Sequence, residues 1–105
     1  MTTARRSSAL PEVPTIAEGG KSLGLGGFDI DTWFGLFGPA RLPAEPTARL
    51  NKAFVDALAS AELKSRLASL YAEPMPMSPE RFAAFVMAEL AKYEPLVKRS
   101  GARVE

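Results

Sequence analysis

The sequence contains no cysteine and no histidine, and these two absences exclude much of the chemistry that proteins perform. Without cysteine there are neither disulfides nor thiol nucleophiles, so cysteine usage does not reveal the redox compartment. Without histidine the chain lacks the commonest general base and the commonest metal ligand. No set of nucleophile, base and metal ligands remains, so we predict that the chain is not an enzyme and takes no metal or cofactor.

The chain also lacks an excess of charge of one sign and any long apolar run. Its 13 lysines and arginines balance 12 acidic residues to a net charge of +1, which argues against a nucleic-acid partner. No apolar stretch approaches the roughly 20 residues of a membrane-spanning helix, so we predict no membrane insertion. Residues 1–8 are basic but lead into no apolar region, unlike a secretory signal. The sequence as given therefore predicts a cytoplasmic location, unless an upstream segment is missing.

One stretch, residues 28–37, has a strong β signature and holds the only tryptophan and half of the six phenylalanines. Apolar and polar residues alternate from Phe28 to Thr32, which is typical of a strand with one wet face. From Trp33 onward the stretch is almost continuously apolar, which is typical of a strand covered on both faces. We predict one long strand here, ended by Pro39 because proline has no N–H to donate.

The remaining periodic segments predict helices. Thr15 and Glu18 have the spacing of a capping box, which predicts a short turn over residues 15–19. Apolar residues at helical spacing predict longer helices over residues 43–60, 60–70 and 78–101. Ser60 is the predicted cap of the second long helix, Ser78 with Pro79 begins the third, and Pro95 predicts a kink or break within it.

These elements predict an α+β fold in which three main helices pack on a small sheet of one long strand (about 28–37) and one or two short ones. Residues 72–77 are the candidate for a short edge strand. We expect an N-terminal segment over residues 1–27, Gly-rich and extended with one helical turn, and a strand-plus-three-helix domain over residues 28–105. A lone apolar strand has an exposed edge, which predicts a homodimer formed by strand pairing or element exchange.

Several polar or soft side chains could be functional in principle, but each has a simpler interpretation. Asp29 and Asp31 could form half a metal site, yet no further ligand accompanies them, so a solvated strand face is favoured. Arginines at positions 5 and 6 could clamp a carboxylate, although a solvated terminus is the default. The methionines at 75 and 77 suit gap filling better than metal binding. The Gly-rich residues 19–27 lack the first glycine of a phosphate loop and the third of a dinucleotide fingerprint.

Four phrases of the sequence, in order, carry a resemblance to a known family: residues 6–18 (RSSALPEVPTIAE), residues 27–37 (GFDIDTWFGLF), residues 43–51 (PAEPTARLN) and residues 72–82 (AEPMPMSPERF). Together the chain resembles the C-terminal portion of a Bug-type receptor, the extracytoplasmic solute-binding protein of tripartite tricarboxylate transporters. The resemblance implies a fragment of a two-lobed periplasmic binding protein. Its members are periplasmic and bind small carboxylates.

The resemblance also implies where a ligand would be contacted. It places residues 28–37 at the crossing between lobes, so Thr32 and Trp33 would lie near the hinge and cleft; a core role for Trp33 remains the simpler alternative. Half a cleft should bind its carboxylate weakly or not at all. The chain is thus interpreted as a truncated solute-binding-protein remnant. The alternative is a stand-alone interaction or dimerisation module whose exposed strand docks a second copy or a separately encoded receptor piece.

Overall fold

The computed structural model describes residues 1–101 and divides the chain into two compact units, Met1–Phe37 and a second unit from Gly38 onward. The predicted boundary at residues 27 and 28 remains a prediction. Residues 102–105, the end of the domain that we expected over residues 28–105, lie outside the described residues.

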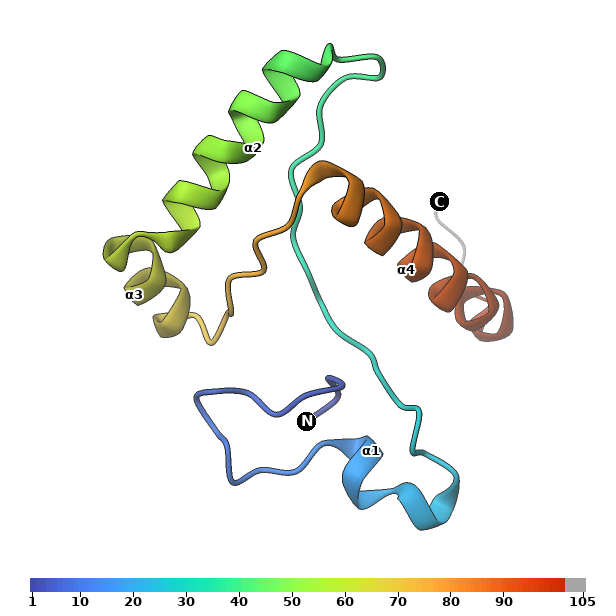
Figure 1. Ribbon diagram of the computed structural model, residues 1–105. Helices are drawn as coiled ribbons and strands as arrows, with labels where there is room; N and C mark the ends of the chain where they lie inside the picture. Colours follow the sequence, from blue (N-terminus) through green and yellow to red (C-terminus); the bar gives the residue numbers. More distant parts are fainter. Residues whose placement is uncertain (102–105) are drawn as a thin grey trace. The chain divides into compact units, whose positions relative to one another are not determined.

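The first unit contains two short helices, α1 (Ile16–Gly19) and the 3-10 helix η1 (Lys21–Leu23) (Figure 1). Helix α1 begins at the predicted capping box, in which the Thr15 hydroxyl accepts from the Glu18 N–H and the Glu18 carboxylate accepts from the Thr15 N–H. The box satisfies two backbone donors that a helix start leaves open. The chain then turns at Gly24, whose φ of 78° lies in the left-handed region that glycine adopts readily.

The second unit contains three helices, α2 (Ala44–Ala59), α3 (Ala61–Ser69) and α4 (Pro79–Ser100), and α2 contacts both α3 and α4. The predicted caps are present, because the Ser60 hydroxyl accepts from the Leu63 N–H and the Ser78 hydroxyl accepts from the Arg81 N–H. Helix α4 continues through Pro95 to a left-handed Gly101, so the helix does not break at the proline, and the kink that was the other expectation stays a prediction. No helix within residues 1–101 is long and apolar enough to cross a membrane.

The predicted sheet is wrong. Residues 1–101 form no strand, and residues 28–37 run as a long trace without regular structure (Figure 1). The physical reason is that a strand is made by hydrogen bonds to neighbouring strands, and a lone apolar strand has none. The Ile30 N–H donates to the Thr2 carbonyl at 2.9 Å, but this bond is not continued into a ladder. The proposed edge strand at residues 72–77 is likewise irregular, held to α2 where the Asn51 amide donates to the Met77 carbonyl.

A hydrophobic core is also missing from the part of the chain that the structure describes. No apolar side chain there is buried; only Thr15 and Glu89 are, with 3% and 9% of their surface exposed. In α2 the least exposed residues include Asn51, Val55 and Leu58, whereas the apolar Leu50 is more than half exposed. The amphipathic helices therefore form as the sequence predicts, but the surfaces that should cover their apolar faces are not supplied by these residues.

Candidate functional site

The candidate ligand residues Thr32 and Trp33 lie in the middle of the irregular segment 28–37. The Thr32 side chain is exposed and the Trp33 side chain is half-buried. The Thr32 N–H donates to the Asp31 carboxylate at 2.7 Å, which fixes the local backbone without using the Thr32 hydroxyl.

The two aspartates of this segment bind backbone N–H groups. Asp29 accepts from the Ala4 N–H at 3.0 Å, and Asp31 accepts from the Thr32 N–H next to it. Within residues 1–101, no three acidic, histidine or cysteine side chains gather as a metal site would require. The structure therefore gives Asp29 a positioning role, since it ties the segment to the chain start.

Arg6 is occupied within its own unit. Its Nε donates to both oxygens of Glu18, at 2.9 and 3.2 Å, and its Nη1 donates to the Pro11 carbonyl at 2.9 Å. Hydrogen bonding from the Thr15 backbone, followed by that from Arg6, lowers the pKa of Glu18. The carboxylate clamp that we considered for the N-terminal arginines thus exists, but its carboxylate belongs to the protein. The capping-box spacing identifies Glu18 in the sequence, but no short-range sequence pattern identifies Arg6 as its ion-pair partner.

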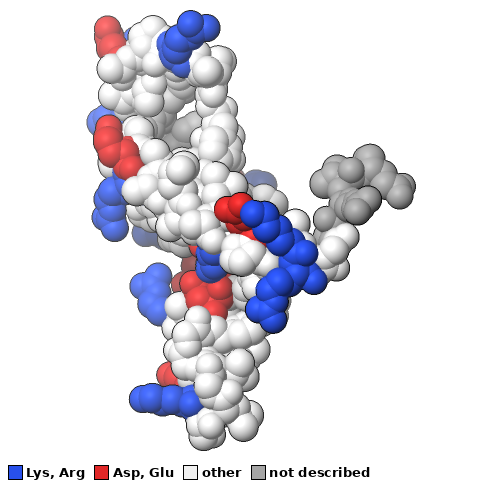
Figure 2. All heavy atoms as spheres, turned by 90° about the vertical axis from the view of Figure 1, so that its right-hand side faces the viewer, with Lys and Arg blue, Asp and Glu red and all other residues white. Residues whose placement is uncertain are grey.

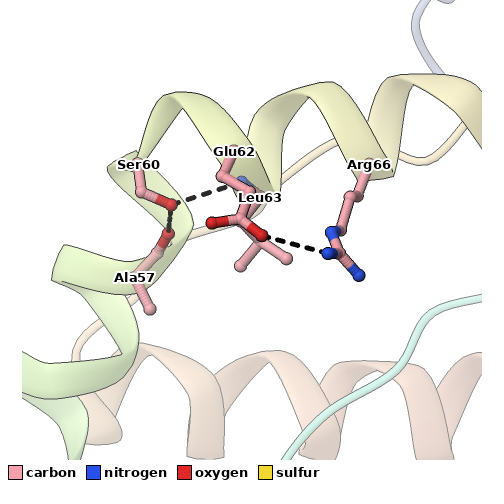
Figure 3. A pocket seen from close by; sticks show the side chains of 5 residues that line it. All are labelled: Ala57, Ser60, Glu62, Leu63 and Arg66. Atoms are coloured by element: carbon pink, nitrogen blue, oxygen red, sulfur yellow. Dashed lines mark hydrogen bonds and ion pairs between the residues drawn. The ribbon is translucent and has the colours of Figure 1, made fainter.

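The second unit has a hollow of about 330 Å³ where α2 meets α3, lined by Ala57, Ser60, Glu62, Leu63 and Arg66 (Figure 3). Its polar groups bind one another. The Ser60 hydroxyl donates to the Ala57 carbonyl at 2.7 Å, and an Arg66 nitrogen lies 3.0 Å from a Glu62 oxygen. These bonds tie the polar groups of the hollow to one another and to the helix backbone.

Charged side chains of both signs are interspersed over the face shown in Figure 2. Several form exposed ion pairs one helical turn apart, such as Lys52 with Asp56 and Lys98 with Glu94, both at 2.6 Å. Pairs of this kind contribute only a few tenths of a kcal/mol each, about 0.3–0.5. These pairs belong to solvated helix surfaces.

Comparison with known proteins places the chain in a family. The model of the tripartite tricarboxylate transporter family receptor, TctC, matches residues 1–102, so the chain belongs to this family. The family is one of solute receptors and not of enzymes. No solved structure gives a significant match.

Three curated relatives show how much of such a protein the chain represents. It is 34% identical to a UPF0065 protein from the tcbD-tcbE intergenic region of Pseudomonas sp. (strain P51), over 92% of this chain and 28% of the relative. It is 34% identical to a UPF0065 protein from the TAR-I ttuE-ttuC' intergenic region of Agrobacterium vitis, over 93% of this chain and 27% of the relative. It is 28% identical to Protein BugT of Bordetella pertussis, over 95% of this chain and 29% of the relative. The chain spans less than a third of the length of these relatives.

Proposed function

We propose that this chain is part of a periplasmic receptor for small carboxylates and that on its own it binds such ligands weakly. The observation that carries the proposal is the match of the receptor family model to residues 1–102. The share of each relative that the chain covers, 27–29%, supports the second half of the proposal. A ligand cleft needs several convergent polar groups, and fewer than a third of a receptor supplies few of them.

Within the chain, Thr32 and Trp33 are the proposed ligand contacts. A threonine hydroxyl can donate to a carboxylate, and the tryptophan indole adds an N–H donor on a flat apolar ring. The exposure of Thr32 leaves its hydroxyl within reach of a ligand, and Trp33 is half-buried beside it. The exposed Thr32 hydroxyl is therefore the group that we expect a carboxylate to perturb most.

NMR titration tests this proposal. Dicarboxylates, aromatic acids and amino acids are added at millimolar concentration while the amide resonances are followed. We expect one of the carboxylates to shift the amides of Thr32 and Trp33, and the Thr32→Ala variant to reduce those shifts. Thr47→Ala is the control, because the Thr47 hydroxyl is already bonded to the Pro43 carbonyl at the start of α2. Shifts confined to other residues, or no shifts with any ligand, would contradict the ligand role.

A second candidate function is that of a protein-interaction module. It is favoured by the exposure of Phe34 and Leu36, whose surfaces are 95% and 65% accessible. Exposed apolar side chains that lie close together along the chain are typical of a surface that another protein covers. The homodimer that we predicted is one form of this function, and sedimentation velocity over a range of protein concentrations tests it. A monomer at every concentration would exclude the homodimer.

A further inference from the structure

We propose that the peptide bond between Phe34 and Gly35 is a proteolytic processing site, at which an endoprotease with a pocket for aromatic side chains first cuts this chain. Cleavage at this bond goes beyond the proposed function, because it acts on the chain itself and does not depend on a carboxylate ligand.

The segment around this bond has the local structure that an endoprotease requires. A protease binds several residues on either side of the bond in an extended form, so helical residues must unfold before they can enter its cleft. Residues 28–39 contain neither helix nor strand nor turn (Figure 1). Exposed segments of this kind are the usual sites of proteolytic nicking. The bond can therefore be cut without local unfolding.

The Phe34 side chain is available to the specificity pocket of a protease. It is 95% exposed, more than any other large apolar side chain within residues 1–101. Its ring suits an apolar slot of the kind that selects aromatic residues in serine proteases. Gly35 follows it and has no side chain to obstruct the approach of the catalytic groups. The two residues together provide an anchor and an unobstructed bond.

Most other exposed large apolar residues of the described chain lie in helices or precede proline. Those of η1, α2 and α4, such as Phe54 and Leu90, belong to helical turns. A proline directly after the bond places a ring there and removes the N–H, which hinders cleavage. The exposed residues that precede a proline are Leu10, Val13, Leu42 and Met75.

Three further exposed residues are held in turns. The Leu25 carbonyl accepts from the Phe28 N–H at 2.9 Å, which closes a turn at Leu25. Leu70 and Tyr71 end helix α3, and the φ of 55° at Tyr71 lies in the left-handed region instead of the extended one. These residues must change conformation before a protease can bind them.

Within the segment itself, Phe34 is preferred over its exposed neighbours. Leu36 is 65% exposed and has no aromatic ring. Phe37 is 67% exposed, but Pro39 stands two residues after it, within the stretch that a protease binds. Phe34 is thus the exposed aromatic residue that combines irregular structure with a following stretch free of proline.

Hydrolysis at this bond consumes one water molecule and needs no other reactant. The bond between the Phe34 carbonyl carbon and the Gly35 nitrogen breaks, the hydroxyl of the water joins the carbon, and its remaining proton goes to the released amine. One product carries α1 and η1 together with Thr32 and Trp33, and the other carries α2, α3 and α4. A single cut therefore separates the proposed ligand contacts from the three long helices.

Limited proteolysis of the full chain with chymotrypsin tests the proposal. Fragments are identified by mass spectrometry at early time points, and a synthetic peptide of residues 29–39 gives the rate for an unstructured substrate. We expect residues 1–34 and 35–105 as the first products, at least about tenfold faster than any cut within α2 or α4. The rate in the chain should lie within about tenfold of that in the peptide. A first cut at any other bond, or a rate further below that of the peptide, overturns the proposal.

Substitutions show whether Phe34 itself directs the cut. Phe34→Tyr keeps an aromatic ring and should keep the rate, whereas Phe34→Glu puts a charge into an apolar pocket and should lower it at least about tenfold. Leu23→Glu, the same kind of change at a residue that is 77% exposed in η1, should leave the rate unchanged. Circular dichroism verifies that each variant keeps its helices.

Gly35→Pro provides a second test that leaves the aromatic ring in place. It should abolish cleavage after residue 34, because proline directly follows the bond. Cleavage at this position that continues at an unchanged rate in Phe34→Glu or in Gly35→Pro would overturn the assignment of the site.

Discussion

The Arg6 guanidinium and the Glu18 carboxylate form an ion pair in which Nε lies 2.9 Å from Oε2. The pair joins the start of the chain to helix α1, across the loop that carries both early prolines. The same carboxylate accepts from the Thr15 N–H at 2.8 Å, so one side chain closes the loop and caps the helix. This unit has no buried apolar side chain among its residues, and polar contacts of this kind link its segments.

Acidification should loosen this unit. The pKa of Glu18 is lowered in the folded chain, mainly by hydrogen bonding from the Thr15 backbone and then by Arg6. A carboxyl group whose pKa is lower in the folded than in the unfolded chain stabilises the fold when the pH is above its unfolded pKa of about 4.3. That contribution is lost as the pH falls through the folded pKa. NMR shifts of residues 15–19 followed from pH 6 to about pH 2.5 measure this change.

The control for acidification is Glu18→Gln, which keeps a side chain of similar shape without the titrating group. The Glu18→Gln variant should keep the capping bond, because the glutamine oxygen also accepts from the Thr15 N–H, but lose the ion pair with Arg6 and show a flatter pH profile. Glu80 gives an internal comparison, because hydrogen bonds from its own N–H and from Ser78 also lower its pKa, at the start of α4. If the NMR shifts of residues 15–19 depended on pH in the same way in Glu18→Gln as in the unsubstituted chain, Glu18 would not be the group whose titration destabilises α1.

Gly20→Ala should unfold the turn between α1 and η1. A Cβ built at Gly20 would lie 2.9 Å from both the Ile16 carbonyl oxygen and the Leu25 Cβ, closer than real contacts allow. Because the Ile16 carbonyl is backbone, it cannot move aside cheaply, and we expect a loss of about 1–3 kcal/mol. The matched control is Gly19→Ala, where nothing lies within 4 Å. Carbon-13 chemical shifts of residues 15–25 in both variants give the measurement, and equal effects would refute the steric account.

Tyr71→Gly should stabilise the end of α3. Tyr71 has a φ of 55°, in the left-handed region, and its N–H donates to the Ala68 carbonyl at 3.0 Å. A side chain in this conformation costs about 1–2 kcal/mol that glycine does not pay, which is why helices commonly end on glycine. We expect higher helicity over residues 61–69, measured by amide exchange. Leu70→Gly is the control, since Leu70 has a φ of −98° and gains nothing; an equal gain there would contradict the argument.

Ser60→Ala and Ser78→Ala should each shorten a helix. Both hydroxyls accept from a backbone N–H three residues later, at 3.3 Å, and loss of such a cap costs about 1 kcal/mol. Ser69→Ala is the control, because the Ser69 hydroxyl only donates to the Arg66 carbonyl. Amide exchange in the first turns of α3 and α4 should rise in the cap variants alone, and a rise in Ser69→Ala of the same size would refute the capping role.

These residues also show which features a sequence reveals. The helix starts at Thr15, Ser60 and Ser78 were predicted correctly because a cap depends on residues only three positions apart. The strand was predicted from the same kind of local pattern and is absent from the described residues, because a strand is stabilised by partners distant in sequence. The pair of Arg6 with Glu18 was missed for a related reason, since twelve residues separate its members. The roles of Thr32 and Trp33 remain predictions.

The central claim is that residues 32–37 of this receptor-family chain form no strand on their own, and amide hydrogen exchange of the isolated chain at neutral pH tests it most directly. The account predicts that residues 32–37 exchange at nearly the rate of an unstructured peptide, while amides in the middle of α2 and α4 are protected. Protection of residues 32–37 in the isolated chain, equal to that of the helices, would show that the segment is already paired and would contradict the account.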